Sequence, residues 1–77
     1  MLEKIREILA AQLALDPEDV TENANFRNDL GIDSLDLLAL VMALEDEYAF
    51  DMTAEEMAEL RTVSDLLKFM KDEGVTG

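Results

Sequence analysis

The chain has 77 residues, of which 19 are acidic and 6 are basic, and it contains no histidine and no cysteine. A chain of this length forms at most one small domain, and we expect residues 1–77 to be that single domain. Without imidazole or thiol groups it supplies no zinc-type metal site and no histidine or cysteine catalysis, and its net charge of −13 disfavours nucleic acid and anionic membranes as partners.

The first predicted element is an amphipathic helix at about residues 2–14. Side chains suited to a buried face recur there at three- and four-residue spacing, and charged side chains occupy the opposite face. The repeating set is Leu2, Ile5, Ile8, Leu9, Gln12 and Leu13. The helix should end before Pro17, because proline disfavours helical geometry in the residue that precedes it.

A long loop is predicted from Leu15 to Ile32, where Asp, Asn, Pro and Gly residues interrupt the helical pattern. Loops longer than about 12–15 residues are uncommon unless they are functional. Two interpretations therefore stay open, a packed connector with no other role and a loop that forms part of a site. In both, apolar side chains should anchor the loop to the core, and the candidates are Val20, Phe26, Leu30 and Ile32.

The second helix is predicted at about residues 34–48. Asp33 is its expected N-cap, and Asp36 lies at the third helical position, where a carboxylate faces free backbone amides. Residues 37–44 are all apolar, so this helix is apolar around most of its circumference. A run of eight is far shorter than the roughly 20 apolar residues that span a bilayer.

Two further helices follow. Thr53-Ala54-Glu55-Glu56 has the spacing of a capping box and predicts a short helix that ends near Leu60. A fourth helix should begin at Thr62 and stop before Gly74. Strand signals are absent, so the sequence predicts an all-α fold, a small four-helix bundle with three longer helices, one short helix and a long loop between the first and the second.

The second helix has more apolar surface than a small bundle buries. One set of side chains should face the core, namely Leu37, Leu40, Val41, Leu44 and Tyr48. A second set, which we call the apolar strip, lies on the neighbouring face and consists of Leu35, Leu38 and Met42. Exposed apolar surface rimmed by charge is typical of a protein contact. The alternative is that the first helix or the long loop covers the strip.

Acidic residues dominate the middle of the chain. Between Arg27 and Arg61 there is no basic residue, and the acids there are Asp29, Asp33, Asp36, Glu45, Asp46, Glu47, Asp51, Glu55, Glu56 and Glu59. A surface of one sign around an apolar strip steers a partner that carries Lys and Arg. The plainer interpretation is a solvated face without a partner.

Ser34 follows the predicted N-cap of the second helix. Nothing in the chain is suited to deprotonate its hydroxyl, so we do not expect it to act as a nucleophile of its own. As an acceptor it is well placed, because a phosphate ester there meets the free amides and the positive dipole end of the helix. The sequence therefore indicates a hydroxyl that another enzyme modifies.

The segment from Asp29 to Asp36 reads Asp-Leu-Gly-Ile-Asp-Ser-Leu-Asp, and the segment from Leu40 to Tyr48 reads Leu-Val-Met-Ala-Leu-Glu-Asp-Glu-Tyr. Together they resemble the acyl carrier proteins, most of all the discrete bacterial type used in fatty-acid synthesis, and the resemblance extends over the whole chain. It implies a carrier, not an enzyme, in which a phosphopantetheinyl transferase attaches 4′-phosphopantetheine from coenzyme A to Ser34.

The resemblance also implies partners. Acyl groups would travel as thioesters on the arm between synthesis and transfer enzymes whose basic patches engage the carrier. Separately, the absence of cysteine fits a cytoplasmic protein, and the strong like charge predicts a monomer. The contact residues that the resemblance implies are Asp33, Asp36, Glu45, Asp46 and Glu47, and the apolar strip adds Leu35, Leu38 and Met42 to the predicted partner surface. Adaptable methionines, among them Met42, Met57 and Met70, suit an interior that opens for an acyl chain.

Three positions depart from the family pattern. Ala39 stands where fatty-acid carriers commonly have glutamate, Leu37 stands where a small polar residue is usual, and Thr53 begins the third helix where a proline often precedes it. A specialised polyketide or peptidyl-type carrier therefore stays open as the alternative within the class.

Outside the class, the alternatives are an acidic decoy that inhibits a basic protein and an enzyme. The decoy accounts for the charge but not for a serine at the start of the most apolar helix, and exposed acids on a small bundle offer an enzyme no sheltered cleft. Residues 29–33 lack the alternating oxygen ligands of an EF-hand loop, although weak divalent-cation binding by the acid-rich helices stays open.

Overall fold

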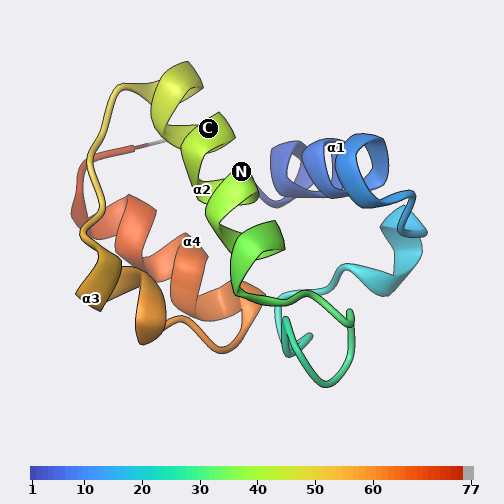
Figure 1. Cartoon of the computed structure of the whole chain (residues 1–77). Helices are drawn as coiled ribbons and strands as arrows, with labels where there is room; N and C mark the ends of the chain where they lie inside the picture. The colour runs from blue at the N-terminus through green and yellow to red at the C-terminus, as the bar shows by residue number, and fades with distance from the viewer. Residues whose placement is uncertain (76–77) are drawn as a thin grey trace.

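Four α-helices and one short 3₁₀ helix make up the computed structural model, which describes residues 1–75 (Figure 1). Their order is α1 (Leu2–Leu13), η1 (Pro17–Asp19), α2 (Ser34–Tyr48), α3 (Ala54–Ala58) and α4 (Val63–Asp72). The predicted all-α fold, with three longer helices and one short helix, is confirmed. No helix within the described range is both long and apolar enough to cross a membrane.

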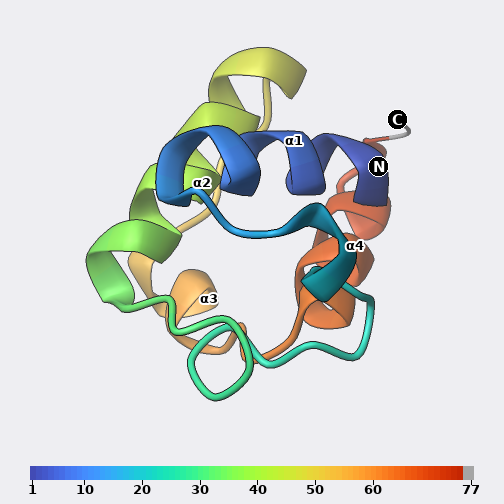
Figure 2. The same cartoon turned by 90° about the vertical axis from the view of Figure 1, so that its right-hand side faces the viewer.

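The helices surround a single core. α2 runs through the middle of the molecule in Figure 1, with α1 on one side and α3 and α4 on the other, and α1 lies across the front in Figure 2. The buried side chains come from α1, the long loop, α2, the segment before α3, and α4. They are Ile5, Leu9, Val20, Ala24, Phe26, Leu30, Ile32, Leu40, Val41, Leu44, Phe50, Val63, Leu66 and Met70.

Short-range caps set the starts of the later helices. Asp33 is extended, and its Oδ1 accepts a hydrogen bond of 2.9 Å from the Asp36 amide, so α2 begins at Ser34 as predicted. At α3, Thr53 and Glu56 each accept a hydrogen bond from the other's backbone amide, which is the predicted capping box.

The helix ends differ slightly from the predictions. α1 ends at Leu13, because Ala14 adopts the left-handed conformation with φ of 54° and closes the last turn. α3 ends at Ala58, two residues before the predicted Leu60. Gln12, which the pattern placed on the inner face of the first helix, is exposed.

Two predicted core positions of α2 lie at the edge of the core. Leu37 and Tyr48 are half-buried, whereas Leu40, Val41 and Leu44 are buried. Leu37 lies one turn into the helix and Tyr48 is its last residue, so less of the bundle covers them. Both still pack against the core cluster.

The long loop is ordered by hydrogen bonds and by its anchors. All four predicted anchors are buried. Asn25 Oδ1 accepts hydrogen bonds from the amides of Arg27 and Asn28, and the Asp29 carboxylate accepts one from the Asn25 amide. These bonds hold residues 25–29 in a tight turn.

Backbone hydrogen bonds also join the long loop to the start of α4. Phe26 N donates to Arg61 O at 2.8 Å, Val63 N donates to Ala24 O at 3.0 Å, and an isolated antiparallel bridge pairs residues 25 and 62. The turn of residues 25–29 is therefore held beside the segment that precedes α4. The long loop is therefore a packed connector. The alternative, that it also forms part of a site, depends on what lies beside its turn.

Candidate functional site

Ser34 is the first residue of α2, and it is exposed. Its hydroxyl makes no hydrogen bond within residues 1–75, and the amides of Ser34 and Leu35 donate to no described acceptor. The amide of Asp36 is already satisfied by Asp33. Two free amides and the positive end of a helix of 15 residues therefore surround an accessible hydroxyl, an arrangement that suits a phosphate ester.

A groove of about 470 Å³ opens beside Ser34. Its walls come from the turn at residues 25–28, the first turn of α2, and the segment from α3 to Arg61. Phe26, Ile32, Leu37 and Met57 line its apolar parts, and Asn25, Arg27, Asn28, Asp33 and Arg61 line its polar parts. Leu37, predicted for the core, is thus also part of the groove wall.

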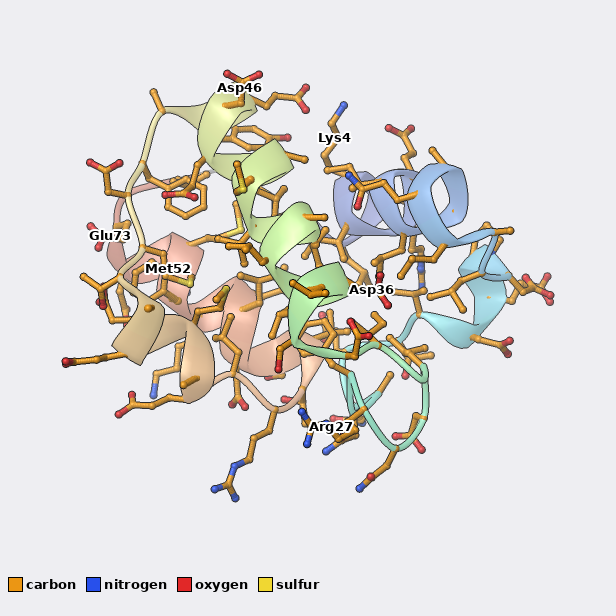
Figure 3. All side chains as sticks on the ribbon, in the orientation of Figure 1. Lys4, Arg27, Asp36, Asp46, Met52 and Glu73 are labelled. Atoms are coloured by element: carbon orange, nitrogen blue, oxygen red, sulfur yellow. The ribbon has the colours of Figure 1, made fainter. Side chains whose placement is uncertain are left out.

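The two arginines of the groove were not predicted as site residues. Both are exposed, and the Arg27 guanidinium has no hydrogen bond or ion pair within the described part of the chain. In the view of Figure 3, Arg27 lies on the turn of the long loop, below the first turn of α2 on which Asp36 is labelled. No sequence signal pairs these arginines, because 33 residues separate them and none of those residues is basic.

Asp65 is the third residue of α4, and its carboxylate contacts the backbone of Arg61. Its Oδ2 accepts hydrogen bonds from the amides of Arg61 at 3.0 Å and Thr62 at 3.1 Å. These backbone donors, together with the nearby charge of Arg61, hold the pKa of the Asp65 carboxyl below its usual value. Asp65 is therefore a capping group, and it fixes the backbone that presents Arg61 to the groove.

The apolar strip is exposed. Leu35 is 76% exposed, Leu38 is 38% exposed and Met42 is 58% exposed. The alternative in which the first helix or the long loop covers these side chains is therefore wrong. Ala39, on the same helix, is exposed as well, so the middle of α2 presents apolar atoms without an intervening charge.

The predicted acidic contact residues do not form one uniform set. Asp46 is exposed, Asp36 is half-buried, and neither carboxylate has a hydrogen bond or ion pair among residues 1–75. Glu45 Oε2, in contrast, accepts a hydrogen bond of 3.1 Å from the Met52 amide. Glu47 Oε1 lies 2.9 Å from Lys4 Nζ of α1.

The ion pair with Glu47 changes the titration of Lys4. The hydrogen bond from Lys4 to Glu47 raises the pKa of the lysine above its ordinary value of 10.5, against a smaller opposing effect of desolvation. In Figure 3 the Lys4 side chain extends from α1 toward the C-terminal part of α2. Glu45 and Glu47 therefore make contacts inside the molecule in addition to any contact with a partner.

Acidic side chains elsewhere do not converge on a common point. No group of three or more acidic side chains in the described part of the chain is placed to hold a metal ion. The acids of the middle segment are instead spread over the surface, which suits long-range attraction of a basic partner better than coordination of a cation.

Comparisons with known proteins agree with these observations. A family described as a phosphopantetheine attachment site matches residues 3–70. The acyl carrier protein of Thermosynechococcus vestitus is 46% identical over 72 residues, which cover 94% of this chain and 89% of that protein. The crystal structure of an acyl carrier protein from Thermotoga maritima aligns with a TM-score of 0.81 and 38% identity, and the alignment covers 90% of this chain and 80% of that chain.

Proposed function

This chain belongs to the acyl carrier protein family, whose covalent group is 4′-phosphopantetheine, and we propose that Ser34 is the residue that carries this group. The observation that supports the assignment most is the free Ser34 hydroxyl at the open N-terminus of α2. When attached, the group supplies the thiol that this sequence lacks, and acyl groups are held on it as thioesters.

The residues around Ser34 fit a phosphodiester. The free amides of Ser34 and Leu35 would donate to the phosphate oxygens of an attached group, and the groove beside the hydroxyl leaves room for the start of the arm. The chain is a carrier and not an enzyme, so the base and the metal for attachment come from the phosphopantetheinyl transferase. Residues 1–77 act as one carrier domain.

The cargo that we propose is the growing acyl chain of fatty-acid biosynthesis, delivered to the enzymes that extend and transfer it in the cytoplasm. Both relatives described above are acyl carrier proteins, and the chain covers 89% of one and 80% of the other. The second candidate is a specialised polyketide or peptidyl-type carrier. The apolar middle of α2 around the exposed Ala39 favours it, because partners of such a helix need fewer basic contacts there.

The partner surface that we propose runs along α2 from Ser34 to its C-terminal end. It joins the exposed apolar strip to the acidic side chains beside it, so that a basic and partly apolar patch on a synthesis or transfer enzyme fits it. Its residues are Asp33, Leu35, Asp36, Leu38, Met42, Glu45, Asp46 and Glu47. Like charges on a small domain disfavour self-association, so the carrier acts as a monomer.

The attachment is tested by incubating the protein with coenzyme A and a phosphopantetheinyl transferase of broad specificity, followed by intact-mass measurement. We expect one added phosphopantetheine on the wild type and none on Ser34→Ala. Ser64→Ala is the matched control, because Ser64 is the other serine of the chain and is exposed in the first turn of α4. Addition to Ser34→Ala, or loss of addition in Ser64→Ala, would contradict the assignment.

The partner surface is tested through the rate of that same modification. Asp36→Lys and Asp46→Lys should slow it about tenfold or more at low ionic strength and much less at high ionic strength, because steering is screened by salt. Glu18→Lys changes the net charge equally but lies on η1, away from α2. Equal slowing by all three variants would indicate a dependence on net charge alone and would count against this surface.

A further inference from the structure

The six basic residues differ in whether they form ion pairs within the described part of the chain. Lys4 pairs with Glu7 and Glu47, and Arg6 pairs with Glu3 and donates to the carbonyl of Val20. Lys68 and Lys71 lie on α4. The remaining two are Arg27 and Arg61, and both line the groove beside Ser34. Two of the six basic residues therefore line this one groove, in a protein with a net charge of −13.

The backbone, and not the side chains, brings these arginines together. Phe26, next to Arg27, donates its amide to the carbonyl of Arg61, and Asn25 fixes the turn that carries Arg27. The Asp65 carboxylate holds the amide of Arg61 from the other side. Because both guanidinium groups are exposed and neither makes an ion pair in the described residues, they are available to an anion in the groove.

An anion attached to Ser34 would lie close to the negative charges of neighbouring carboxylates. Asp33 precedes the serine and lines the groove, and Asp36 lies within the same turn of α2. A phosphodiester at Ser34 therefore adds a negative charge next to two carboxylates. An arginine can neutralise that added negative charge, because its planar guanidinium group binds two phosphate oxygens at once.

Resting on the attachment to Ser34 proposed above, we infer that Arg27 and Arg61 form a phosphate-binding cradle that holds the phosphodiester and the first part of the arm in the groove. The occupant is the chain's own prosthetic group, and the complementary charges of the two arginines select it. In this arrangement the arm leaves Ser34 along the groove, one wall of which comes from α3, instead of extending freely into solvent.

The test compares backbone amide spectra of the unmodified and the phosphopantetheine-bearing protein by ¹H–¹⁵N NMR. In the wild type, attachment should shift amides on the far walls of the groove, at Asn28 and Ala58, as well as those next to Ser34. Arg27→Gln/Arg61→Gln should reduce these distant shifts. Because exposed ion pairs are weak, we expect a reduction of roughly two- to fivefold per arginine, and a similar loss in the wild type at high salt.

The matched control is Lys68→Gln/Lys71→Gln, which removes the same charge from exposed positions of α4. It should leave the distant shifts unchanged. Shifts confined to the first turn of α2 in the wild type, or equal reductions in both double variants, would overturn the cradle. Intact mass of the same samples separates the two proposals, because a missing mass increase contradicts attachment at Ser34, whereas a full increase without distant shifts contradicts only the cradle.

Should the double arginine variant not fold, the single variant Arg27→Gln carries the test, because the Arg27 side chain has no partner whose loss would affect folding. It should reduce the shift at Asn28 more than the shift at Ala58, since Arg27 and Asn28 lie on the same turn. An unchanged shift at Asn28 in this variant would also contradict the cradle.

Discussion

The two ends of α2 carry similar acidic residues in the sequence but differ in what those residues contact. At the N-terminal end, Asp33 bonds only the first turn of its own helix, the hydroxyl of Ser34 and the carboxylate of Asp36 have no partner in the described residues, and a groove opens beside them. At the C-terminal end, Glu45 binds the backbone of the segment before α3 and Glu47 binds α1. The N-terminal end presents an accessible hydroxyl, and the C-terminal end holds α1 and the segment before α3 in place.

This difference shows why acidity alone is a poor guide to a partner surface. A carboxylate that is already bonded inside the molecule has to give up or share that bond before it contacts a partner, whereas an unbonded one does not. We therefore expect Asp36 and Asp46 to contribute mainly to association, and Glu45 to contribute to stability as well.

The largest effect should come from comparing two leucines of the same helix. Leu44 is fully buried near the C-terminal end of α2, and Leu35 is 76% exposed near its N-terminal end. Leu44→Ala should lower the free energy of unfolding by about 2–5 kcal/mol, because it leaves a cavity in the core. Leu35→Ala should change it by less than about 0.5 kcal/mol. Urea denaturation followed by circular dichroism measures both, and similar losses would show that the strip is covered in solution.

A smaller effect should distinguish Glu45 from its neighbour. Glu45→Ala removes the acceptor of the Met52 amide and should cost roughly 1–2 kcal/mol, because a half-buried donor is left without its charged partner. Asp46→Ala is the control at an exposed position without a bond. The same denaturation measurement applies. If the two variants lost equal stability, the bond between Glu45 and Met52 would not be important in solution.

The smallest effect should appear at alkaline pH. The pKa of Lys4 is raised in the folded protein, so the contribution of its pair with Glu47 is fully present at neutral pH and is lost as pH rises above 10.5 through the folded value. Arginine stays charged there, so Lys4→Arg should lose less stability than the wild type between about pH 10 and about pH 12.

Lys68→Arg is the control for this measurement, since Lys68 has no ion pair in the described residues. It should follow the wild type over the same pH range. A Lys4→Arg variant that also follows the wild type would mean that the link between α1 and the end of α2 does not contribute to folding.

Much of the fold was predictable because its signals are local. The caps at Asp33, Thr53 and Thr62 join residues three positions apart, so the sequence displays both partners of each hydrogen bond. The anchors of the long loop stand out as isolated apolar residues among polar ones. The inward position of Gln12 was wrong, and α1 and α3 end one and two residues before the approximate predicted ends. All three differences concern helix ends, where few hydrogen bonds decide the boundary.

The sequence by itself determined the helices, the two apolar faces of α2 and the position of Ser34 at the start of that helix, because each follows from spacing along the chain. Whether the apolar strip is exposed was decided by the tertiary structure. Only the tertiary structure decided that Arg27 and Arg61 share one groove with Ser34, and that Glu45 and Glu47 are bonded while Asp46 is not. These arrangements join residues distant in sequence, and packing of the whole chain sets which of them meet.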